Sequence, residues 1–238
     1  MGLARMVYHR LFPLGLRSIR AIRFELARMR SERWYTEIAD RRMFLNHAFE
    51  CIAFNEITGD YAEFGCWSAI TFPLAYHATR RAKVNRMLWA FDSFAGLPES
   101  TDPRDAHPKW SPHTMSMSIE DFHRVLAERG VPRSAYRVVA GYYEQTLLAD
   151  AAGMPGDIAL AYIDCDMYSS THTVLRFLEP RLKHGMILAL DDYFCCSASR
   201  PPGEKLALEQ FFAKHQGWRL VPYIQYGWGG MSFMLERQ

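Results

Sequence analysis

The sequence predicts an α/β fold in which a mostly parallel, seven-stranded sheet is covered on both faces by helices. Two observations predict it. Short hydrophobic runs alternate with helical patterns from about residue 60 to residue 215, which is typical of parallel strands joined by helices. The last two hydrophobic runs have no helical pattern between them, so we expect an antiparallel hairpin at the sheet edge.

Helical patterns also precede the predicted sheet. Pro13 and Gly15 interrupt the first pattern, so we expect one helix at about 16–34 and a second at about 36–58, which Gly59 ends. These N-terminal helices are expected to cover the edge of the sheet. We therefore divide the chain into a basic amphipathic extension, residues 1–35, and one α/β domain, residues 36–238.

The other elements follow in chain order. Strands are short runs rich in β-branched, aromatic and aliphatic residues, and helices carry apolar residues three or four apart. The expected strands are 61–64, 87–91, 136–140, 158–163, 186–190, 218–223 and 231–235, and the expected helices are 71–81, 118–129, 144–151, 170–182 and 204–215. The segment 93–117 has four prolines and no periodicity, which is typical of a lid or binding loop, and Trp110 within it offers a face for a sugar ring.

Size and composition favour one hydrophobic core. The chain has 238 residues, of which 49% are hydrophobic, and no apolar run reaches the ~18 residues that a membrane-spanning helix needs. The N-terminus does not resemble an export signal, because arginines interrupt its apolar positions. The five cysteines include no C-x-x-C pair, so we expect reduced, buried thiols and a cytoplasmic protein.

Charge is distributed unevenly. Residues 1–34 contain eight arginines and two glutamates, whereas the whole chain has a net charge of only +2. One interpretation is the solvated face of a helix that forms a homo-oligomer. The other is contact with a polyanion, a partner subunit or the inner face of a membrane. We expect no nucleic-acid partner.

Four aspartates follow two of the predicted strands. Asp164 and Asp166 come after the strand at 158–163, and Asp191 and Asp192 come after the strand at 186–190. Because parallel strands end at the same edge of a sheet, these carboxylates are expected to converge. One such aspartate would usually cap a helix, but four that repel each other require a cation, a shared proton or a cationic ligand.

The first two strands resemble one half of a nucleoside site. Gly65 allows a sharp turn after the first strand, and Asp92 ends the second, where an acid can accept hydrogen bonds from ribose hydroxyls. The dinucleotide fingerprint is absent, because Trp67 and Ile70 replace its second and third glycines. A nucleoside without phosphates suits the site. S-adenosylmethionine is such a cofactor, and Glu63 would suit its ammonium group.

Four segments together resemble the macrocin O-methyltransferase family, which methylates sugar hydroxyls in macrolides and related glycosides. They are E-F-G at 63–65, F-D-S-F-A-G-L-P-E at 91–99, I-D-C-D-M-Y-S-S-T at 163–171 and D-D-Y at 191–193. The similarity covers the chain from about residue 43 to the C-terminus, and the basic segment before residue 35 lies outside it.

The resemblance implies a Rossmann-like class I methyltransferase fold, with S-adenosylmethionine as cofactor. It implies Asp166 as general base and a divalent cation, usually magnesium, held by Asp164, Asp191 and Asp192. The cofactor-binding residues that we expect are Glu63, Gly65, Asp92, Ser93 and Tyr142. The family commonly has glycine where this chain has Ala69, so the turn is expected to be slightly more open or the cofactor shifted.

The predicted function is metal-assisted O-methylation of a sugar or glycoside hydroxyl. Two other interpretations remain: a noncatalytic scaffold or regulatory partner with the same fold, and a metal-dependent hydrolase at the same acidic cluster. The retained aspartates disfavour the scaffold, and a hydrolase would leave Glu63, Gly65 and Asp92 without a role. The acceptor stays open among a free sugar, an antibiotic glycoside, a lipid-linked sugar and a polysaccharide unit.

Overall fold

The structure is a computed structural model that describes residues 32–147, 153–201 and 203–238. The chain divides into two units, Met1–Glu37 and Ile38–Gln238, and the second contains the whole sheet. Most of the expected first helix, at residues 16–31, lies outside the described residues, and so does most of the basic segment. No helix within the described ranges is long and apolar enough to cross a membrane.

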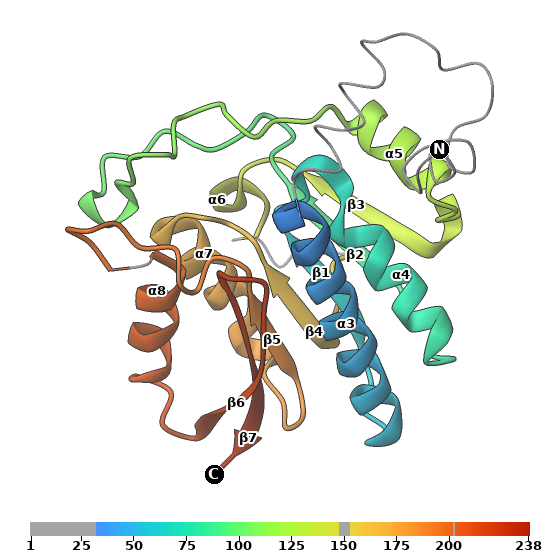
Figure 1. Cartoon of the computed structure of the whole chain (residues 1–238). Helices are drawn as coiled ribbons and strands as arrows, with labels where there is room; N and C mark the ends of the chain where they lie inside the picture. Colours follow the sequence, from blue (N-terminus) through green and yellow to red (C-terminus); the bar gives the residue numbers. More distant parts are fainter. Residues whose placement is uncertain (1–31, 148–152, 202) are drawn as a thin grey trace, which may run out of the picture. The chain divides into compact units, whose positions relative to one another are not determined.

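Seven strands form one sheet in the order β3-β2-β1-β4-β5-β7-β6 (Figure 1). Strands β1 to β5 are parallel, and β7 lies antiparallel between β5 and the edge strand β6. The expected C-terminal hairpin is therefore present. The order reverses between β1 and β4, and ligands of open α/β sheets bind at such a reversal. The strands are β1 (Asp60–Phe64), β2 (Leu88–Asp92), β3 (Tyr136–Ala140), β4 (Ile158–Ile163), β5 (Ile187–Leu190), β6 (Trp218–Tyr226) and β7 (Gly230–Arg237).

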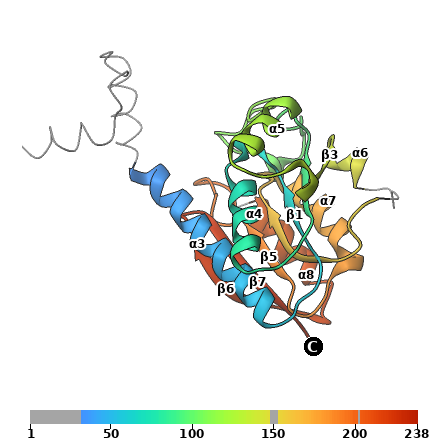
Figure 2. The same cartoon turned by 90° about the vertical axis from the view of Figure 1, so that its right-hand side faces the viewer.

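Helices cover both faces of the sheet (Figures 1 and 2). They are α3 (Glu32–Phe54), α4 (Thr71–Arg81), α5 (Ile119–Glu128), α6 (Tyr143–Thr146), α7 (Tyr168–Leu178) and α8 (Gly203–Phe212). The first three pack on one face and the last three on the other, so the core has two halves. Side chains of β1 alternate between them, because Tyr61 belongs to the α3 side and Ala62 and Phe64 to the α7 side.

Helix α3 differs from its prediction in two ways. It begins at Glu32, without the break expected near residue 35, and it covers a face of the sheet, not the edge. The reason is its apolar stripe, in which Phe44 stacks on Tyr226 at 4.4 Å between ring centroids and also approaches Tyr162. The predicted helix at 170–182 also ends early, since Pro180 lies in the short 3-10 turn Glu179–Arg181.

All five cysteines are free. Cys66, Cys165 and Cys195 are buried, as expected for reduced core thiols, and Cys51 is partly buried. Cys196 is exposed, so the expectation of buried thiols is wrong at that position.

Candidate active site

The turn after β1 forms one wall of the site. Gly65 has a φ of 91°, and a Cβ atom built on it would lie 1.9 Å from the carbonyl oxygen of Asp164. Only glycine fits such a position. The sharp turn expected at Gly65 is present, and it allows close contact with the turn that follows β4. We call the turns after β1 and β2 the nucleoside half of the site, and the turns after β4 and β5 the acidic half. The two halves therefore touch through the backbones of Gly65 and Asp164.

Asp92 ends β2 and holds two neighbouring turns. Its carboxylate accepts hydrogen bonds from the backbone N–H groups of Cys66 and Phe94, each at 2.6 Å. Burial raises the pKa of Asp92, although both backbone donors oppose the shift. Each carboxylate oxygen keeps a lone pair that can accept from a ligand hydroxyl. The Ser93 hydroxyl closes its own turn by donating to the Gly96 carbonyl at 2.8 Å.

Tyr142 lies at the same edge of the sheet. It precedes the first residue of α6 and follows Gly141, whose N–H donates to the Asp92 carbonyl at 2.9 Å. The turn after β1 continues through Ser68 and Ala69, whose φ angles of 66° and 47° are both left-handed. Ala69, where the resemblance led us to expect glycine, is therefore in a conformation that favours glycine.

Glu63 lies inside the protein on the α3 side of β1. Its side chain is 2% exposed and accepts a hydrogen bond of 2.5 Å from the hydroxyl of Tyr61. Burial raises the pKa of Glu63 to about 8, and the nearby charges of Asp191 and Asp92 add to the shift. At neutral pH, a cationic group next to Glu63 would favour its ionised form.

The structure brings the four predicted aspartates together. Asp164 and Asp191 extend the adjacent parallel strands β4 and β5. Burial raises the pKa of Asp164, and the charges of Asp191, Asp192 and Asp166 raise it further. Asp166, with a left-handed φ of 61°, shares a hydrogen bond with Asp192. Burial and Asp191 raise the pKa of Asp192 to about 6, so the Asp166–Asp192 pair holds a proton more readily than two separate aspartates.

Arg41 is a site residue that the sequence analysis missed. Its guanidinium donates to both carboxylate oxygens of Asp191, from Nε at 3.0 Å and from the terminal nitrogen at 2.5 Å. The hydroxyl of Tyr162 donates to the same carboxylate. A signal was present in the sequence, because Arg41 is three residues before Phe44 and four before Leu45, in phase with the buried stripe of α3.

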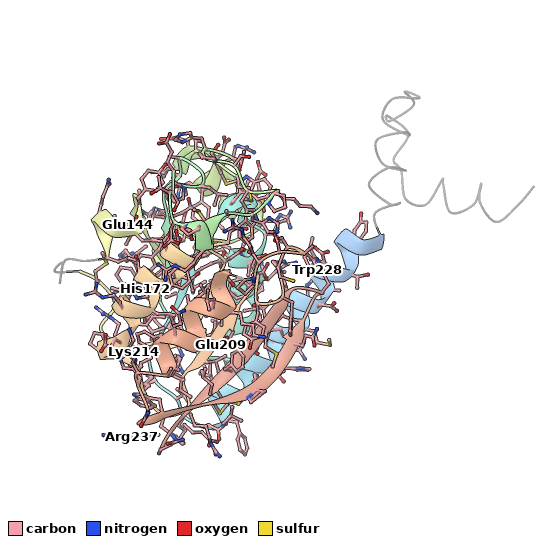
Figure 3. All side chains as sticks on the ribbon, turned by 90° about the vertical axis from the view of Figure 1, so that its left-hand side faces the viewer. Glu144, His172, Glu209, Lys214, Trp228 and Arg237 are labelled. Carbon is pink, nitrogen blue, oxygen red and sulfur yellow. The ribbon has the colours of Figure 1, made fainter. Side chains whose placement is uncertain are left out.

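Glu204 is the second residue that was missed. It lies in the first turn of α8 and is fully buried. One oxygen accepts from the N–H of Cys165 at 2.9 Å and the other from the N–H of Asp192 at 3.0 Å. A single carboxylate thus joins the turn after β4 to the turn after β5. Figure 3 shows Glu209 on the outer side of the same helix, where it is exposed.

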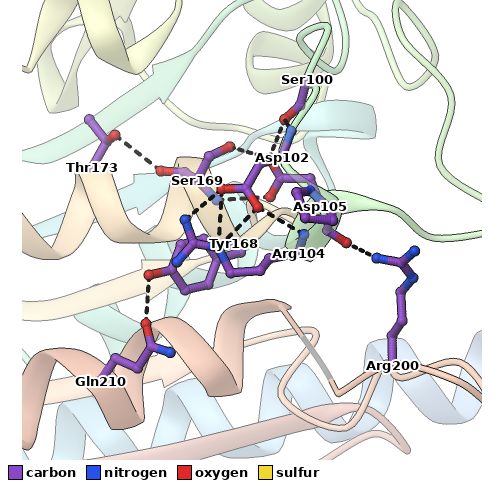
Figure 4. A network of polar contacts seen from close by, with 10 residues as sticks. Ser100, Asp102, Arg104, Asp105, Tyr168, Ser169, Thr173, Arg200 and Gln210 are labelled. Carbon is purple, nitrogen blue, oxygen red and sulfur yellow. Dashed lines mark hydrogen bonds and ion pairs between the residues drawn. The ribbon is translucent and has the colours of Figure 1, made fainter.

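The lid loop is fixed to the site by a polar network (Figure 4). Asp105, which is buried, accepts from the N–H and the hydroxyl of Ser169 at 2.9 and 2.7 Å, and from the hydroxyl of Ser100. Arg104 lies 3.8 Å above the ring of Tyr168. The lid is therefore anchored to the first turn of α7, directly after Asp166.

A cavity of about 710 Å³ lies under this loop. Its walls come from the lid, including Leu97 and Trp110, and from the segment 197–200. Met167, the neighbour of Asp166, also lines it. One face of Trp110 is partly occupied by the ring of His107, at 4.2 Å between centroids. The cavity is large enough for a sugar ring.

The four aspartates at 164, 166, 191 and 192 have the oxygen donors that a divalent cation prefers. Their side chains are not, however, placed to hold one. Carboxylate oxygens are the ligands that magnesium prefers. However, no three acidic, histidine or cysteine side chains among the described residues converge closely enough to hold a metal ion. Asp191, one of the three expected ligands, is instead paired with Arg41.

A sheet of this order is that of the class I methyltransferase fold. The model of the macrocin O-methyltransferase (TylF) family matches residues 19–216, and the chain belongs to that family. The match begins well before residue 35, so the expectation that the basic segment lies outside the family is wrong for residues 19–35.

Two curated relatives are similar to the chain. One is 8-demethyl-8-(2,3-dimethoxy-alpha-L-rhamnosyl)-tetracenomycin-C 4'-O-methyltransferase of Streptomyces olivaceus, 28% identical over 63% of this chain and 58% of the relative. The other is mycinamicin III 3''-O-methyltransferase of Micromonospora griseorubida, 27% identical over 66% of this chain and 63% of the relative. The matches therefore span about three fifths of the length of these relatives.

Two solved structures share the fold. The O-methyltransferase NovP superposes with a TM-score of 0.69 at 24% identity, over 82% of this chain and 79% of NovP. TomG from Streptomyces achromogenes, solved in complex with SAM, superposes with a TM-score of 0.52 at 12% identity, over 82% of this chain and 79% of TomG.

Proposed function

We propose that the protein is an S-adenosylmethionine-dependent O-methyltransferase that acts on a sugar or glycoside hydroxyl. The observation that carries the proposal is the position of Asp166. Asp166 follows the turn in which Asp164 contacts Gly65, its carboxylate is paired with that of Asp192, and its neighbour Met167 lines the cavity under the lid. A base, a nucleoside-like turn and a cavity for an acceptor thus meet at one edge of the sheet.

The cofactor part of the proposal rests on the turns after β1 and β2. Asp92 keeps lone pairs for ribose hydroxyls, and Glu63 gains a favourable partner if the cofactor's ammonium reaches it. Gly65, Ser93 and Tyr142 are expected to line the same site. TomG, which shares the fold, was solved with SAM, and this supports the choice of cofactor.

The chemical step requires a deprotonated acceptor oxygen. Bound S-adenosylmethionine supplies an electrophilic methyl group on a sulfonium. Asp166 removes the hydroxyl proton as the oxygen–carbon bond forms and the carbon–sulfur bond breaks, which leaves an ether and a thioether. Burial and the neighbouring Asp192 raise the pKa of Asp166, so Asp166 acts as a base only after the proton that it shares with Asp192 has left, and its ionised form is then a strong base.

The proposed acceptor is a sugar attached to a larger molecule. One curated relative is named for a rhamnosyl-tetracenomycin and the other for mycinamicin III. The cavity under the lid is lined in part by the segment 197–200 and has both apolar and polar walls, among them Trp110 and Arg200. Such a lining suits the apolar face and the hydroxyls of a sugar.

Metal assistance is a separate component of the proposal, with Asp164, Asp191 and Asp192 as the expected ligands. The oxygen donors support it, whereas the pairing of Asp191 with Arg41 requires a rearrangement first. We expect an excess of chelator or Asp164→Ala to abolish turnover and leave cofactor binding largely intact. Full activity in chelator would refute the metal component alone.

The first test is calorimetry of the metal-stripped protein with S-adenosylhomocysteine. We expect micromolar binding that Asp92→Ala weakens at least ~10-fold, the equivalent of about 1.4 kcal/mol. The control is Glu120→Gln, which removes an exposed charge on α5. If the wild-type protein does not bind, the methyltransferase proposal fails. If it binds, methyl transfer to a panel of glycosides, detected by mass spectrometry, identifies the acceptor.

Cellular setting and assembly complete the proposal. The free cysteines support a reducing compartment, the cytoplasm. Phe54 and Met43 are 88% and 53% exposed on α3, which supports a homo-oligomer. Residues 1–34 are proposed to contact the inner face of a membrane. Sedimentation of the full chain, with and without anionic vesicles, tests both ideas.

A further inference from the structure

Arg41 occupies the carboxylate that the metal component of the proposed function needs. Its guanidinium makes a two-pronged contact with Asp191, with one nitrogen on each oxygen, at 3.0 and 2.5 Å. Such paired contacts are the strongest that arginine makes with a carboxylate. The Asp191 side chain is only 9% exposed and that of Arg41 21%, so solvent screens the pair weakly. Arg41 is thus the resident cation at this carboxylate.

A divalent cation has little room beside this ion pair. A carboxylate offers about four lone-pair positions. On Asp191, the two guanidinium donors and the Tyr162 hydroxyl take three of them. A metal ion at the fourth would lie next to the guanidinium, where two cations repel each other in a poorly screened setting. Arg41 and a metal ion are therefore unfavourable together on Asp191.

The position of Arg41 on α3 allows a metal ion to replace its guanidinium at Asp191. Arg41 precedes the apolar stripe of α3, and its long side chain reaches Asp191 from the helix surface. A change of side-chain conformation moves the guanidinium away without unpacking Phe44 or Leu45, which are fully buried. The next residue, Arg42, is exposed.

We propose that Arg41 is an internal counter-ion which competes with a divalent cation for Asp191. This inference rests on the metal component of the proposed function. Without metal, Arg41 neutralises Asp191. When metal binds, the guanidinium must leave Asp191, so occupancy of the metal site is coupled to α3. Arg41 thereby lowers the apparent affinity for metal and sets the concentration at which the site fills.

The test compares metal binding by Arg41→Gln, Arg42→Gln and wild-type protein. Binding of Mn²⁺ is followed by the loss of the free-ion electron paramagnetic resonance signal, without substrate or turnover. We expect Arg41→Gln to bind Mn²⁺ at least ~10-fold more tightly than wild type, which corresponds to about 1.4 kcal/mol. Arg42→Gln removes the same charge one residue away and should bind like wild type.

Thermal unfolding provides a second measurement. In chelator, Arg41→Gln should melt below wild type, because Asp191 loses its counter-ion, and saturating Mg²⁺ should remove most of that difference. Arg41→Lys keeps the charge but cannot bridge both oxygens, so its Mn²⁺ affinity should lie between those of wild type and Arg41→Gln. This variant serves if Arg41→Gln does not fold.

The outcomes separate this inference from the proposed function. Equal Mn²⁺ affinity in Arg41→Gln and Arg42→Gln would overturn the competition and leave metal assistance standing. Weaker binding by Arg41→Gln would mean that Arg41 supports the metal site, which also overturns it. If no variant binds Mn²⁺, both the inference and the metal component fail, whereas binding of S-adenosylhomocysteine still decides the methyltransferase proposal.

Discussion

The two halves of the candidate site lie at one edge of the sheet but are stabilised differently. In the nucleoside half, Asp92 holds the turns after β1 and β2 through backbone N–H groups of residues close to the strand ends. In the acidic half, Asp191 and the turns after β4 and β5 depend on side chains from α3 and α8, namely Arg41 and Glu204. The first half is held by a carboxylate at a strand end, whereas the second is held by side chains that come from the helices α3 and α8.

This difference matters for chemistry. A turn held by its own backbone keeps its shape whether or not a ligand is bound, which suits a cofactor common to many reactions. Several carboxylates held by a counter-ion and a shared proton can change partners when a ligand arrives. We therefore expect the acidic half to change more than the nucleoside half when a ligand binds.

The largest expected effect comes from removing the base in the acidic half. Asp166→Asn keeps the shape of the side chain but cannot take a proton, so kcat should fall at least ~100-fold. Binding of S-adenosylhomocysteine should change little, because the nucleoside half is intact. Asp121→Asn, an exposed change on α5, serves as the control. A rise in KM with unchanged kcat would instead make Asp166 a binding residue.

The next largest effect is expected at Glu204. In Glu204→Gln, the amide NH₂ faces a backbone N–H of Cys165 or Asp192, so one buried hydrogen bond is lost and two donors oppose each other. We expect a loss of about 1–3 kcal/mol in the free energy of unfolding, measured by urea denaturation. Methyl transfer should fall as the two acidic turns separate.

Glu209→Gln makes the same change on the exposed side of α8 and should alter neither property. If both variants behave alike, Glu204 does not join the two turns. If Glu204→Gln is less stable but transfers methyl groups normally, its role is structural only.

Glu63 gives a pH-dependent comparison. Folding raises its pKa from the ordinary 4.5 to about 8, so between these values the folded state holds a proton that the unfolded chain has released. The free energy of unfolding should therefore fall as pH rises through this window. Glu63→Gln should reduce that fall, measured by urea denaturation at about pH 5 and about pH 8. Glu120→Gln should not.

The cofactor should have a related effect. If its ammonium approaches Glu63, S-adenosylhomocysteine stabilises the carboxylate and reduces the fall in wild type. In Glu63→Gln, the ligand should not change how far the free energy of unfolding falls with pH. An equal effect of the ligand in both proteins would place the ammonium away from Glu63.

The sequence predicts the strands and the four aspartates for the same physical reason. Strands β4 and β5 are fully buried, so each reads as a continuous hydrophobic run, and the polar residues that follow mark its end. The prediction that these carboxylates gather needs only the rule that parallel strands end together. Gly65 was equally visible, although its contact with Asp164 was not.

Arg41 and Glu204 could not be assigned in the same way, because they lie on helices and no strand-end pattern indicates their partners. Arg41 meets Asp191 across 150 residues, and Glu204 meets Cys165 across 39 and Asp192 across 12. An acid in the first turn of a helix is ordinarily explained by the helix dipole, so Glu204 gave no separate signal. The phase of Arg41 with the apolar stripe of α3 was a signal, but only the structure supplies the partner.

The smallest expected effect tests whether the nucleoside half is strained. Ala69 is 1% exposed and has a φ of 47°, a conformation that costs an alanine about 1–2 kcal/mol and a glycine much less. Glycine also gives the unfolded chain more conformational freedom, which lowers the free energy of unfolding by about 0.4–1 kcal/mol. Ala69→Gly should therefore raise the free energy of unfolding by roughly 0.5–1 kcal/mol. Ala127→Gly, on the exposed side of α5, should lower it by about 1 kcal/mol. If the free energy of unfolding rises in Ala69→Gly and falls in Ala127→Gly, the strain lies in the turn after β1. If it falls in both variants, the turn accepts alanine without cost.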